Sequence, residues 1–511
     1  MGDGYNIGLE EQLIKYGYIS ENIPPCFNSE LLFENYESLR SSTRIIASEP
    51  LSTTIAKNEN FRRTVKIPNP EQQLKLFDYI ISKKVEIEEI LSKNTHTLAN
   101  PIKNSVISYD DMHFFDIPLL RDKYKIKSDY IKNLGKKLKH SMGYKYIYKL
   151  DLANFYESIY THTIEWAVIG KEEAKENIRR KKKNLGERLD TFVRNTNNQE
   201  TSGIPTGPFS SRIISELLLN KVDEKLDILK KDMDFQFVHY VDDYEFYFRN
   251  EADYKVMKHK IRNVFDNYRL KINENKTQFL TYPYHNNRDL KDEFTYHIQK
   301  YKKTYNSQNA RLIFFKADEL TALGEKGAYK YLYKQLEKQD LSNVWTEIEP
   351  FLIGHLLIVP SLAQFIIKLI INHKNLVSEN LLKELKINLH VSIEDGLDNE
   401  AQWIFWILCI LEVKFTALEI NELIRKSHDD LLIIMLIRYT YSLNKTTSKR
   451  IRTTLENLLD ELTQYNMRSE RWLLLYEWYF NKWYGYKRLE AIIHDNDFFK
   501  VLHKKKVNFF T

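Results

Sequence analysis

The chain has 511 residues, 43% of them apolar, which is enough to bury more than one core, so we expect two or three domains. Charged residues make up 29%, but the net charge is only +6, so any contact with nucleic acid must come from local patches. Cys26 and Cys409 are the only cysteines, which excludes a disulfide framework and a cysteine-based zinc site and favours a reducing compartment, with the cytosol as the simplest choice.

Residues 1–60 form an N-terminal extension in our interpretation. The first residues lack the basic start and continuous apolar run of a secretory signal. Pro24 and Pro25 block regular backbone hydrogen bonding and mark a loop. We expect this extension to wrap around another part of the molecule.

Residues 61–285 mix short β-like runs with helical stretches, which favours an α+β domain. The β-like runs lie at residues 64–70, 144–152, 235–248 and 277–283. Between them, residues 171–183 hold seven basic and three acidic residues. We interpret this run as a solvated helix face, with a phosphate contact as the alternative.

Residues 286–511 are expected to form an α-helical domain. Beyond about residue 316 the apolar positions recur at three and four spacing between short polar turns, a pattern that indicates stacked helical pairs without a repeat of fixed period. The longest apolar runs, at residues 403–411 and 431–437, are well short of the ~20 residues that span a bilayer. We expect buried helices there and no membrane segment.

Three aspartates stand in unusual places. Asp151 ends a β-like run and precedes a turn into a helix, whereas Asp242 and Asp243 are adjacent within an apolar, aromatic strand. Adjacent carboxylates in such a strand sit at a hairpin turn or coordinate cations, because burying them unpaired is costly. For the Asp242–Asp243 pair alone, the hairpin is the stronger explanation.

A loop between Asp151 and the Asp242–Asp243 pair shifts the balance toward cation binding. Asp151, this loop and the pair rarely arise in this order by chance. Its glycines and prolines enforce irregular backbone, and a serine can cap a helix that begins near Arg212. By itself this is an ordinary junction between a loop and a helix. The residues concerned are Gly203, Pro205, Gly207, Pro208, Ser210 and Ser211.

Four segments in this order resemble the reverse-transcriptase family. They are LANFYESI after Asp151, GIPTGPFSS at residues 203–211, YVDD at residues 240–243 and LKINENKTQFL at residues 270–280. Upstream, residues 61–80 are similar to the fingers segment of bacterial reverse transcriptases. The resemblance covers residues 61–285 and implies a right-hand polymerase with its fingers and palm in that range.

The resemblance also implies two-metal nucleotidyl transfer, which needs two divalent ions about 3.5 to 4 Å apart. Mg²⁺ prefers carboxylates and phosphates, and Mn²⁺ can substitute for it. On this basis Asp151 and Asp242 bridge the ions and Asp243 assists, and the carbonyl of Leu152 completes a metal shell.

Other residues are implied to contact the nucleotide or template. Tyr156, five residues after Asp151, matches the gate that rejects a 2′-hydroxyl and so favours deoxynucleotides; its alternative is core packing. Lys276 matches the lysine that steadies departing pyrophosphate; its alternative is a solvated lysine. The remaining expected contacts are Pro205, Gly207 and Ser211 of the loop and the fingers cations Arg62, Arg63 and Lys66, among which the sequence does not choose.

One subgroup is favoured by the loop, where Thr206 replaces the glutamine common in retroviral and intron enzymes. With Arg212 and Glu216 following, the chain resembles bacterial abortive-infection and defence-associated reverse transcriptases. That resemblance implies a cytoplasmic, Mg²⁺-dependent DNA polymerase in antiphage defence, a helical domain in place of a thumb, a homo-oligomer and a partner RNA beside deoxynucleoside triphosphates and a DNA product.

Some members of that subgroup start untemplated synthesis from one of their own tyrosines. Among 33 tyrosines, Tyr36 and those of residues 473–487 are our guesses for such a primer. Trp472, Trp478 and Trp483 of that region are expected in the helical core, with base stacking as the alternative. Two other functions stay open: a retron-like or intron-like enzyme copying a dedicated RNA, and a non-catalytic RNA-binding protein or toxin.

Overall fold

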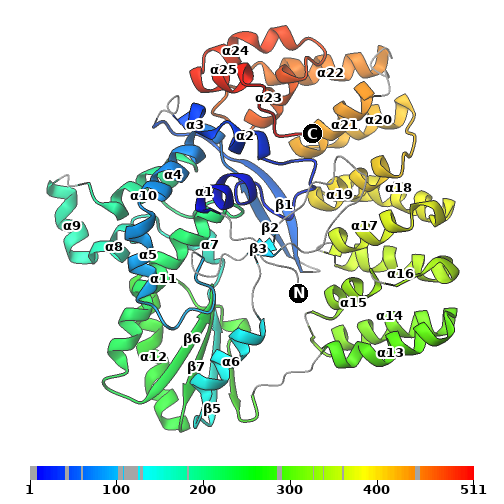
Figure 1. The fold of residues 1–511 in the computed structure, drawn as a ribbon. Coiled ribbons are helices and arrows are strands. Elements are labelled where there is room, and N and C mark those ends of the chain that lie inside the picture. Colours follow the sequence, from blue (N-terminus) through cyan, green and yellow to red (C-terminus); the bar gives the residue numbers. More distant parts are fainter. Residues whose placement is uncertain are drawn as a thin grey trace.

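The computed structural model divides in Figure 1 into a mixed part, up to residue 284, and an arc of helices from residue 290 onward. The arc runs along one side of the mixed part, and its last helix, α25 (Asp497–Lys504), contacts α3 (Tyr36–Leu39) near the N-terminus. The structure describes residues 8–40, 45–58, 61–101, 107–108, 125–126, 130–180, 183–284, 290–325, 327–337, 339–359, 362–442 and 449–511.

An antiparallel four-stranded sheet, in the order β6-β7-β5-β8, lies at the lower end of the mixed part in Figure 1. Successive side chains of a strand point to opposite faces, and in β5, β6 and β7 both faces are largely buried, whereas the edge strand β8 is mostly exposed. Phe237 and Phe246 join the main core, whereas Val238 and Tyr247 join a smaller cluster on the other face. Burial on both faces explains the nearly continuous apolar runs in the sequence. The strands are β5 (Tyr146–Asp151), β6 (Phe235–Tyr240), β7 (Asp243–Phe248) and β8 (Gln278–Thr281).

Helices flank this sheet. Met257, Ile261 and Phe265 of α12 (Glu251–Asn267) are fully buried in the main core, and α12 contacts both β7 and α11 (Phe209–Leu229). At the edge, α6 (Tyr130–Ser141) contacts β6. The four β-like runs predicted in this region therefore all contain strands, although the first strand ends at Ile67 and a helix begins at Pro70.

A second hairpin, β1 (Leu51–Asn58) with β2 (Phe61–Ile67), precedes a group of helices. Asn69 caps α4 (Pro70–Ser82) by accepting a hydrogen bond from the Glu71 amide, and Pro70 suits the first helical position. The helices that follow are α5 (Lys84–Ser92), α7 (Phe155–Ser158), α8 (Thr163–Ile169), α9 (Lys171–Arg180) and α10 (Leu185–Asn195). Helix α9 contains the first part of the basic run at residues 171–183, and it projects from the body in Figure 1.

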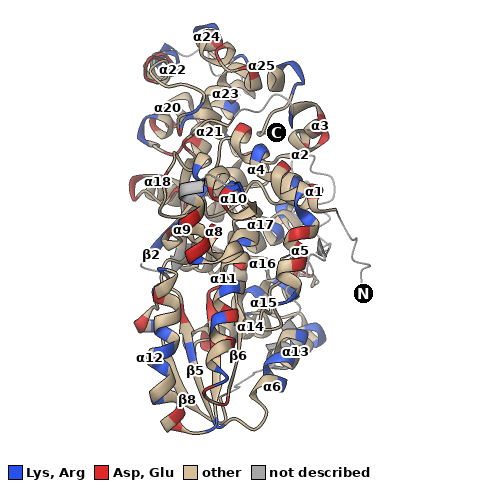
Figure 2. Cartoon of the chain, turned by 90° about the vertical axis from the view of Figure 1, so that its left-hand side faces the viewer, with Lys and Arg blue, Asp and Glu red and all other residues tan. Residues whose placement is uncertain are grey.

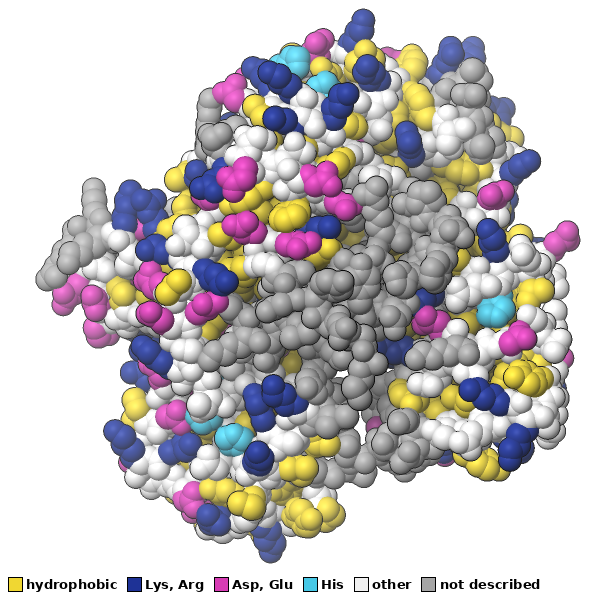
Figure 3. Space-filling view, in the orientation of Figure 1, with side chains coloured by type: hydrophobic (Ala, Val, Ile, Leu, Met, Phe, Trp, Pro, Cys, Tyr) yellow, Lys and Arg dark blue, Asp and Glu magenta, His cyan; other side chains and the backbone are white. Residues whose placement is uncertain are grey.

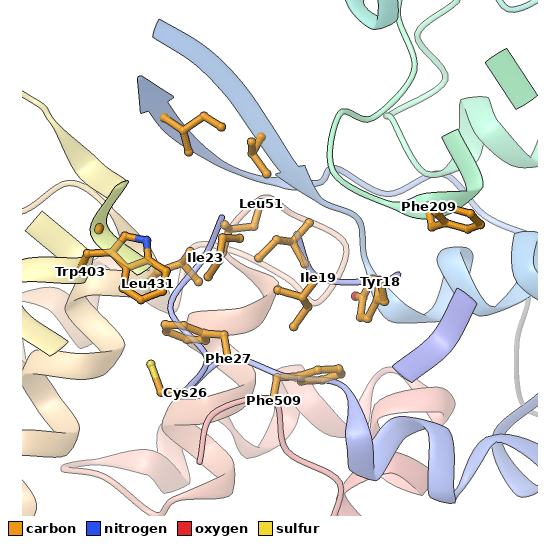
Figure 4. Close-up of a cluster of buried hydrophobic side chains, with 14 of the residues drawn as sticks. Tyr18, Ile19, Ile23, Cys26, Phe27, Leu51, Phe209, Trp403, Leu431 and Phe509 are labelled. Atoms are coloured by element: carbon orange, nitrogen blue, oxygen red, sulfur yellow. The ribbon is translucent and has the colours of Figure 1, made fainter. Parts of the chain in front are cut away.

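The N-terminal extension packs between the rest of the mixed part and the helical arc. Its elements are α1 (Leu9–Glu11), a π-helix (Gln12–Tyr16), α2 (Glu30–Glu34) and α3. In Figure 4, Ile23 and Phe27 lie among side chains from distant parts of the chain, including Trp403 and Phe509. The Tyr18 hydroxyl donates to the Pro68 carbonyl over 2.5 Å. The segment therefore packs against distant parts of the chain.

From residue 290 onward the described elements are helices stacked in two rows. Helices α14, α16, α18, α20 and α22 contact one another in succession, and α13, α15, α17, α19, α21 and α23 form the parallel row. Each row buries one side against the other, so the pairs share a continuous core. Their bounds are α13 (Leu290–Thr304), α14 (Ser307–Ala322), α15 (Ala328–Leu336), α16 (Trp345–Ile358), α17 (Ala363–Asn372), α18 (Glu379–Glu394), α19 (Asp398–Ile410), α20 (Ala417–Lys426), α21 (Asp430–Ser442), α22 (Lys449–Leu462), α23 (Trp472–Phe480) and α24 (Glu490–His494), with α25 last.

The apolar runs at residues 403–411 and 431–437 lie largely in α19 and α21 and are mostly buried, as predicted. No described helix combines the length and apolar character needed to cross a bilayer. Trp472, Trp478 and Trp483 are at most 1% exposed, which confirms their expected core packing. Basic and acidic residues are interspersed over the coloured parts of Figures 2 and 3, in keeping with the small net charge.

Candidate active site

The hairpin joining β6 to β7 holds two of the three aspartates. Tyr240 pairs with Asp243, so Val241 and Asp242 form a two-residue turn. Val241 has a φ of 54°, a left-handed conformation that a β-branched residue adopts only under strain. Strained backbone of this kind is characteristic of functional sites, and here it fixes where Asp242 stands.

The third aspartate lies directly beside this turn. Asp151 ends β5 and pairs across the sheet with Asp243, and the Leu152 amide donates to the Asp242 carbonyl over 3.1 Å. Asp151 is only 8% exposed. Burial, then the charges of Asp243 and Asp151, raise the pKa of Asp242 to about 6. The three carboxylates therefore repel one another, and a bound cation would relieve that repulsion.

Asp151 already has partners. Its carboxylate accepts from Lys276 Nζ over 2.8 Å and from Asn273 Nδ2 over 3.2 Å, and its carbonyl accepts from the Asn273 amide. Within the described residues, no three His, Cys, Asp or Glu side chains converge closely enough to hold an ion as they stand. The donor set, three adjacent carboxylates, nevertheless fits a hard divalent cation such as Mg²⁺.

A pocket of about 170 Å³ opens beside these acids. It brings together seven of the predicted site residues, drawn from β2, β5 and the residue after it, α7, the β6–β7 turn and the segment before β8. These seven are Arg62, Arg63, Asp151, Leu152, Tyr156, Asp242 and Lys276; Asn154, Phe155, Glu157 and Thr206 complete the lining. The predicted residues Lys66, Pro205, Gly207, Ser211 and Asp243 are not among the lining residues.

The three predicted fingers cations have different environments. Arg62 forms a bidentate ion pair with Glu400 of the helical arc, with both N–O distances 2.8 Å. Lys66 donates to Asn197 Oδ1 over 2.7 Å, and burial lowers its pKa. Arg63 is exposed at the pocket and has no ion-pair partner in the described part of the chain. Of the three predicted cations, Arg63 is the one that is both exposed and at the pocket.

Tyr156 lines the pocket while packing against the interior. Its carbonyl accepts from the Ile204 amide, and its ring lies 5.3 Å from that of Phe155. Burial raises the pKa of its hydroxyl to about 12, so the phenol stays neutral. Phe155 is buried, as expected. Tyr156 is therefore both packed against the interior and part of the pocket wall.

The loop at residues 203–208 reaches the pocket through Thr206, which lines it. Gly207 has a φ of +131°, and a Cβ there would lie 3.1 Å from the Lys66 carbonyl oxygen, so glycine is required. Ser211 Oγ donates to the Pro205 carbonyl over 2.6 Å, and Ser210 Oγ accepts from Gln73. The Ser211 hydroxyl therefore stabilises the loop itself, and the Ser210 hydroxyl helps to pack the start of the next helix against Gln73.

The predicted start of the next helix is wrong. Helix α11 begins at Phe209, not near Arg212, and its N-cap Pro208 has no capping side chain. The reason is that proline fixes φ near −65°, which leads directly into the helix, while the Ser211 hydroxyl is used by the loop.

The tyrosines guessed as primers are mostly withdrawn from solvent. Tyr36 is 3% exposed, and its hydroxyl donates to Asp78 Oδ1. Burial raises the pKa of this hydroxyl, which therefore stays protonated. Tyr476 is fully buried and donates to the Val507 carbonyl. A hydroxyl held in this way is poorly placed to attack a nucleotide.

Sequence reasoning missed a buried network behind the β6–β7 turn. His239 Nδ1 lies 3.1 Å from the Val241 carbonyl oxygen and its Nε2 lies 2.9 Å from Asp223 Oδ2. Asp223 also accepts from the Tyr244 hydroxyl and from Asn94. The available signal was His239 itself, a polar residue directly before the YVDD segment in an apolar strand.

Part of the chain matches a known protein family. Residues 74–326 match the family described as reverse transcriptase (RNA-dependent DNA polymerase). No curated protein matches the chain.

Among solved structures, apo telomerase from Candida tropicalis aligns at 14% identity over 83% of this chain and 77% of that chain, with a TM-score of 0.32. Telomerase from Candida albicans in complex with a TWJ fragment of telomeric RNA aligns at 13% identity over 77% and 66%, with a TM-score of 0.29. A truncated apo telomerase from Candida tropicalis aligns at 14% identity over 48% and 52%, so the chain spans about half of its length, with a TM-score of 0.31. Scores this low do not establish a shared fold.

Proposed function

Because the chain contains a reverse transcriptase domain and is therefore an RNA-directed DNA polymerase, we propose that it joins deoxynucleotides by two-metal catalysis at Asp151, Asp242 and Asp243. The observation that carries this proposal is the pairing of Asp151 with Asp243 beside a strained turn that holds Asp242. The raised pKa of Asp242 supports it, since three crowded acids are stabilised by added positive charge.

In this proposal Asp151 and Asp242 would hold two Mg²⁺ ions, with Asp243 and the Leu152 carbonyl as further ligands. The ions would activate the primer hydroxyl and neutralise the triphosphate. Arg63 binds the triphosphate in the pocket that it lines, and Lys276, now paired with Asp151, stabilises the departing pyrophosphate. Tyr156 excludes a 2′-hydroxyl by its bulk at the wall.

The test is incorporation of labelled deoxynucleotides by the purified full chain with Mg²⁺. Loss of one or two metal ligands removes several kcal/mol of transition-state stabilisation, so Asp242→Asn with Asp243→Asn should lower the rate by about 10²- to 10³-fold. Asp266→Asn, which changes an exposed acid on α12, is the matched control and should keep the wild-type rate. Synthesis retained by the double variant would exclude these acids as the catalytic centre.

The sugar gate has its own measurement. Tyr156→Val should raise incorporation of ribonucleotides relative to deoxynucleotides by about 10- to 200-fold, the usual range for steric selection in a pocket. An unchanged ratio would assign Tyr156 to packing alone.

We further propose a role in bacterial antiphage defence of the abortive-infection type, with the protein acting in the cytoplasm as a homo-oligomer. The support is the resemblance carried by residues 203–216, together with the helical arc that follows the polymerase domain. Expression of the wild-type chain should reduce phage plating, and the Asp242 and Asp243 double variant should not. Protection that survives the double substitution would favour a non-catalytic protein.

The nature of the primer and of the template can be tested in reactions to which neither is added. Purified protein is incubated with Mg²⁺ and each labelled deoxynucleotide, and the product is separated on denaturing gels after protease or ribonuclease treatment. Label released only by protease means a protein primer. Label that depends on co-purified RNA of one sequence means the retron-like alternative.

A further inference from the structure

The β1–β2 hairpin is anchored to the first turn of α19, although hairpin and helix are far apart in the sequence. The amide and hydroxyl of Thr54 both donate to Asp398 Oδ2, over 3.1 and 2.7 Å. The neighbouring Thr53 hydroxyl accepts from Gln402 Nε2 over 2.9 Å. These contacts join backbone and side chains of the hairpin to one rigid helix end.

Arg62 is the centre of this junction. Its Nη1 and Nη2 each donate to Glu400, its Nε donates to the Thr54 hydroxyl over 2.9 Å, and Nη2 also donates to the Thr54 carbonyl over 3.1 Å. Four N–H groups are thus used, and arginine has five. The Glu400 side chain is only 7% exposed, so the pair is shielded from solvent and strong. Little of the guanidinium remains for a phosphate.

Arg63, the next residue, is not held by an ion pair of this kind in the described part of the chain. Arg63 lines the same pocket, is exposed and has no ion-pair partner among the described residues. Consecutive side chains of a strand leave it on opposite faces. Fixing Arg62 against α19 therefore fixes the rotation of β2 about its own axis, and with it the direction in which Arg63 points.

We propose that Glu400 is a positioning residue for the nucleotide site: it holds Arg62 in a structural role, so that the helical arc sets the orientation of Arg63 toward the triphosphate. This inference rests on the proposed function, because it takes the pocket to be the nucleotide site. It assigns different tasks to two adjacent arginines, and it makes the helical arc part of the polymerase site without touching the substrate.

The test compares Glu400→Gln, Glu400→Asp and Arg63→Ala in the full chain. Two quantities are measured: the dissociation constant of a labelled deoxynucleoside triphosphate with Mg²⁺, and hydrogen exchange of the β1–β2 amides. Arg63→Ala should weaken triphosphate binding by about 10- to 100-fold, the range for a lost hydrogen-bonded charge, with exchange in the hairpin unchanged.

Glu400→Gln should weaken binding by about tenfold, because displaced binding groups lose alignment, and it should also speed exchange of the β1–β2 amides. Glu400→Asp, which keeps the carboxylate, should recover a large part of both effects. A general loss of packing would not be rescued by charge in this way. The matched control is Glu394→Gln, which removes an exposed ion pair with Lys426 in the same arc and should change neither quantity.

Two results would overturn the proposal. Unchanged binding and exchange in Glu400→Gln would mean that the pair is incidental. Tighter binding would mean that Glu400 competes with the triphosphate for Arg62, which is the reverse of a positioning role. Neither measurement needs turnover, so a wild-type protein that binds nucleotide but makes no DNA would refute the proposed function separately.

Discussion

His239 is a single residue on which the geometry of the strained turn depends. Its side chain is fully buried between the Val241 carbonyl and the Asp223 carboxylate. Burial alone would lower its pKa, but the charge and hydrogen bond of Asp223, with the charge of Glu216, raise it to about 9. The imidazolium is therefore the stable form at neutral pH, with its charge beside the Asp223 carboxylate and its Nδ1 within hydrogen-bond distance of the Val241 carbonyl.

A pH dependence of stability follows from this shift. Because the pKa is raised from 6.5 in the unfolded chain to about 9 in the folded one, the stabilisation is complete below about pH 6.5 and is lost as the pH rises through 9. Between pH 7 and 9.5 the loss is on the order of 2 kcal/mol. Measured as the melting midpoint, the wild type should fall over that interval and His239→Gln should fall much less.

Measuring between pH 7 and 9.5 separates the titration of His239 from that of other buried groups. Glu216, Asp430 and Glu477 have pKa values raised by burial to about 7, so their contributions change mainly below that pH. An equal decline in wild type and His239→Gln above pH 7 would contradict a charged His239.

At the scale of elements, the loop at residues 203–208 shows how backbone shape supports the site. Gly207→Ala introduces a Cβ 3.1 Å from the Lys66 carbonyl oxygen at a φ of +131°, which should cost about 1–3 kcal/mol. The melting midpoint should fall by several degrees. Gly354→Ala in α16 is the control, since a Cβ there meets nothing within 4 Å and alanine favours a helix, so it should be neutral or slightly stabilising. Equal midpoints for the two variants would mean that the loop adapts freely.

The same elements show what the sequence could predict. The strand ending at Asp151 and the hairpin at Asp242 were predictable because each is specified by a short local pattern of apolar and acidic residues. The start of α11 was not, because the capping power of a serine depends on whether the loop already uses its hydroxyl, as Ser211 does. The Arg62–Glu400 pair joins residues 338 positions apart, and no local pattern encodes such a contact.

At the scale of the whole molecule, one hydrophobic cluster runs from Leu9 to Phe510 and includes residues of every part. Trp403 of the helical arc donates to the Asn22 carbonyl of the extension, and Trp472 packs near Ile67 of β2, to whose carbonyl it donates. Parts with a shared core unfold together, so the full chain should melt in a single calorimetric transition. The fragment 1–284 alone should expose apolar surface and bind the dye ANS strongly. Two well-separated transitions in the full chain would show that its parts are independent.

The contact between the two ends of this cluster has a consequence for the order of events during synthesis. Phe27 pairs with Phe510, and Asn28 contacts Thr511, which follows it by 483 positions. At about 5–20 residues per second, a ribosome needs about 25 to 95 s to add the intervening chain. For that time the extension lacks its final partners, and its apolar side chains depend on chaperones or on temporary contacts.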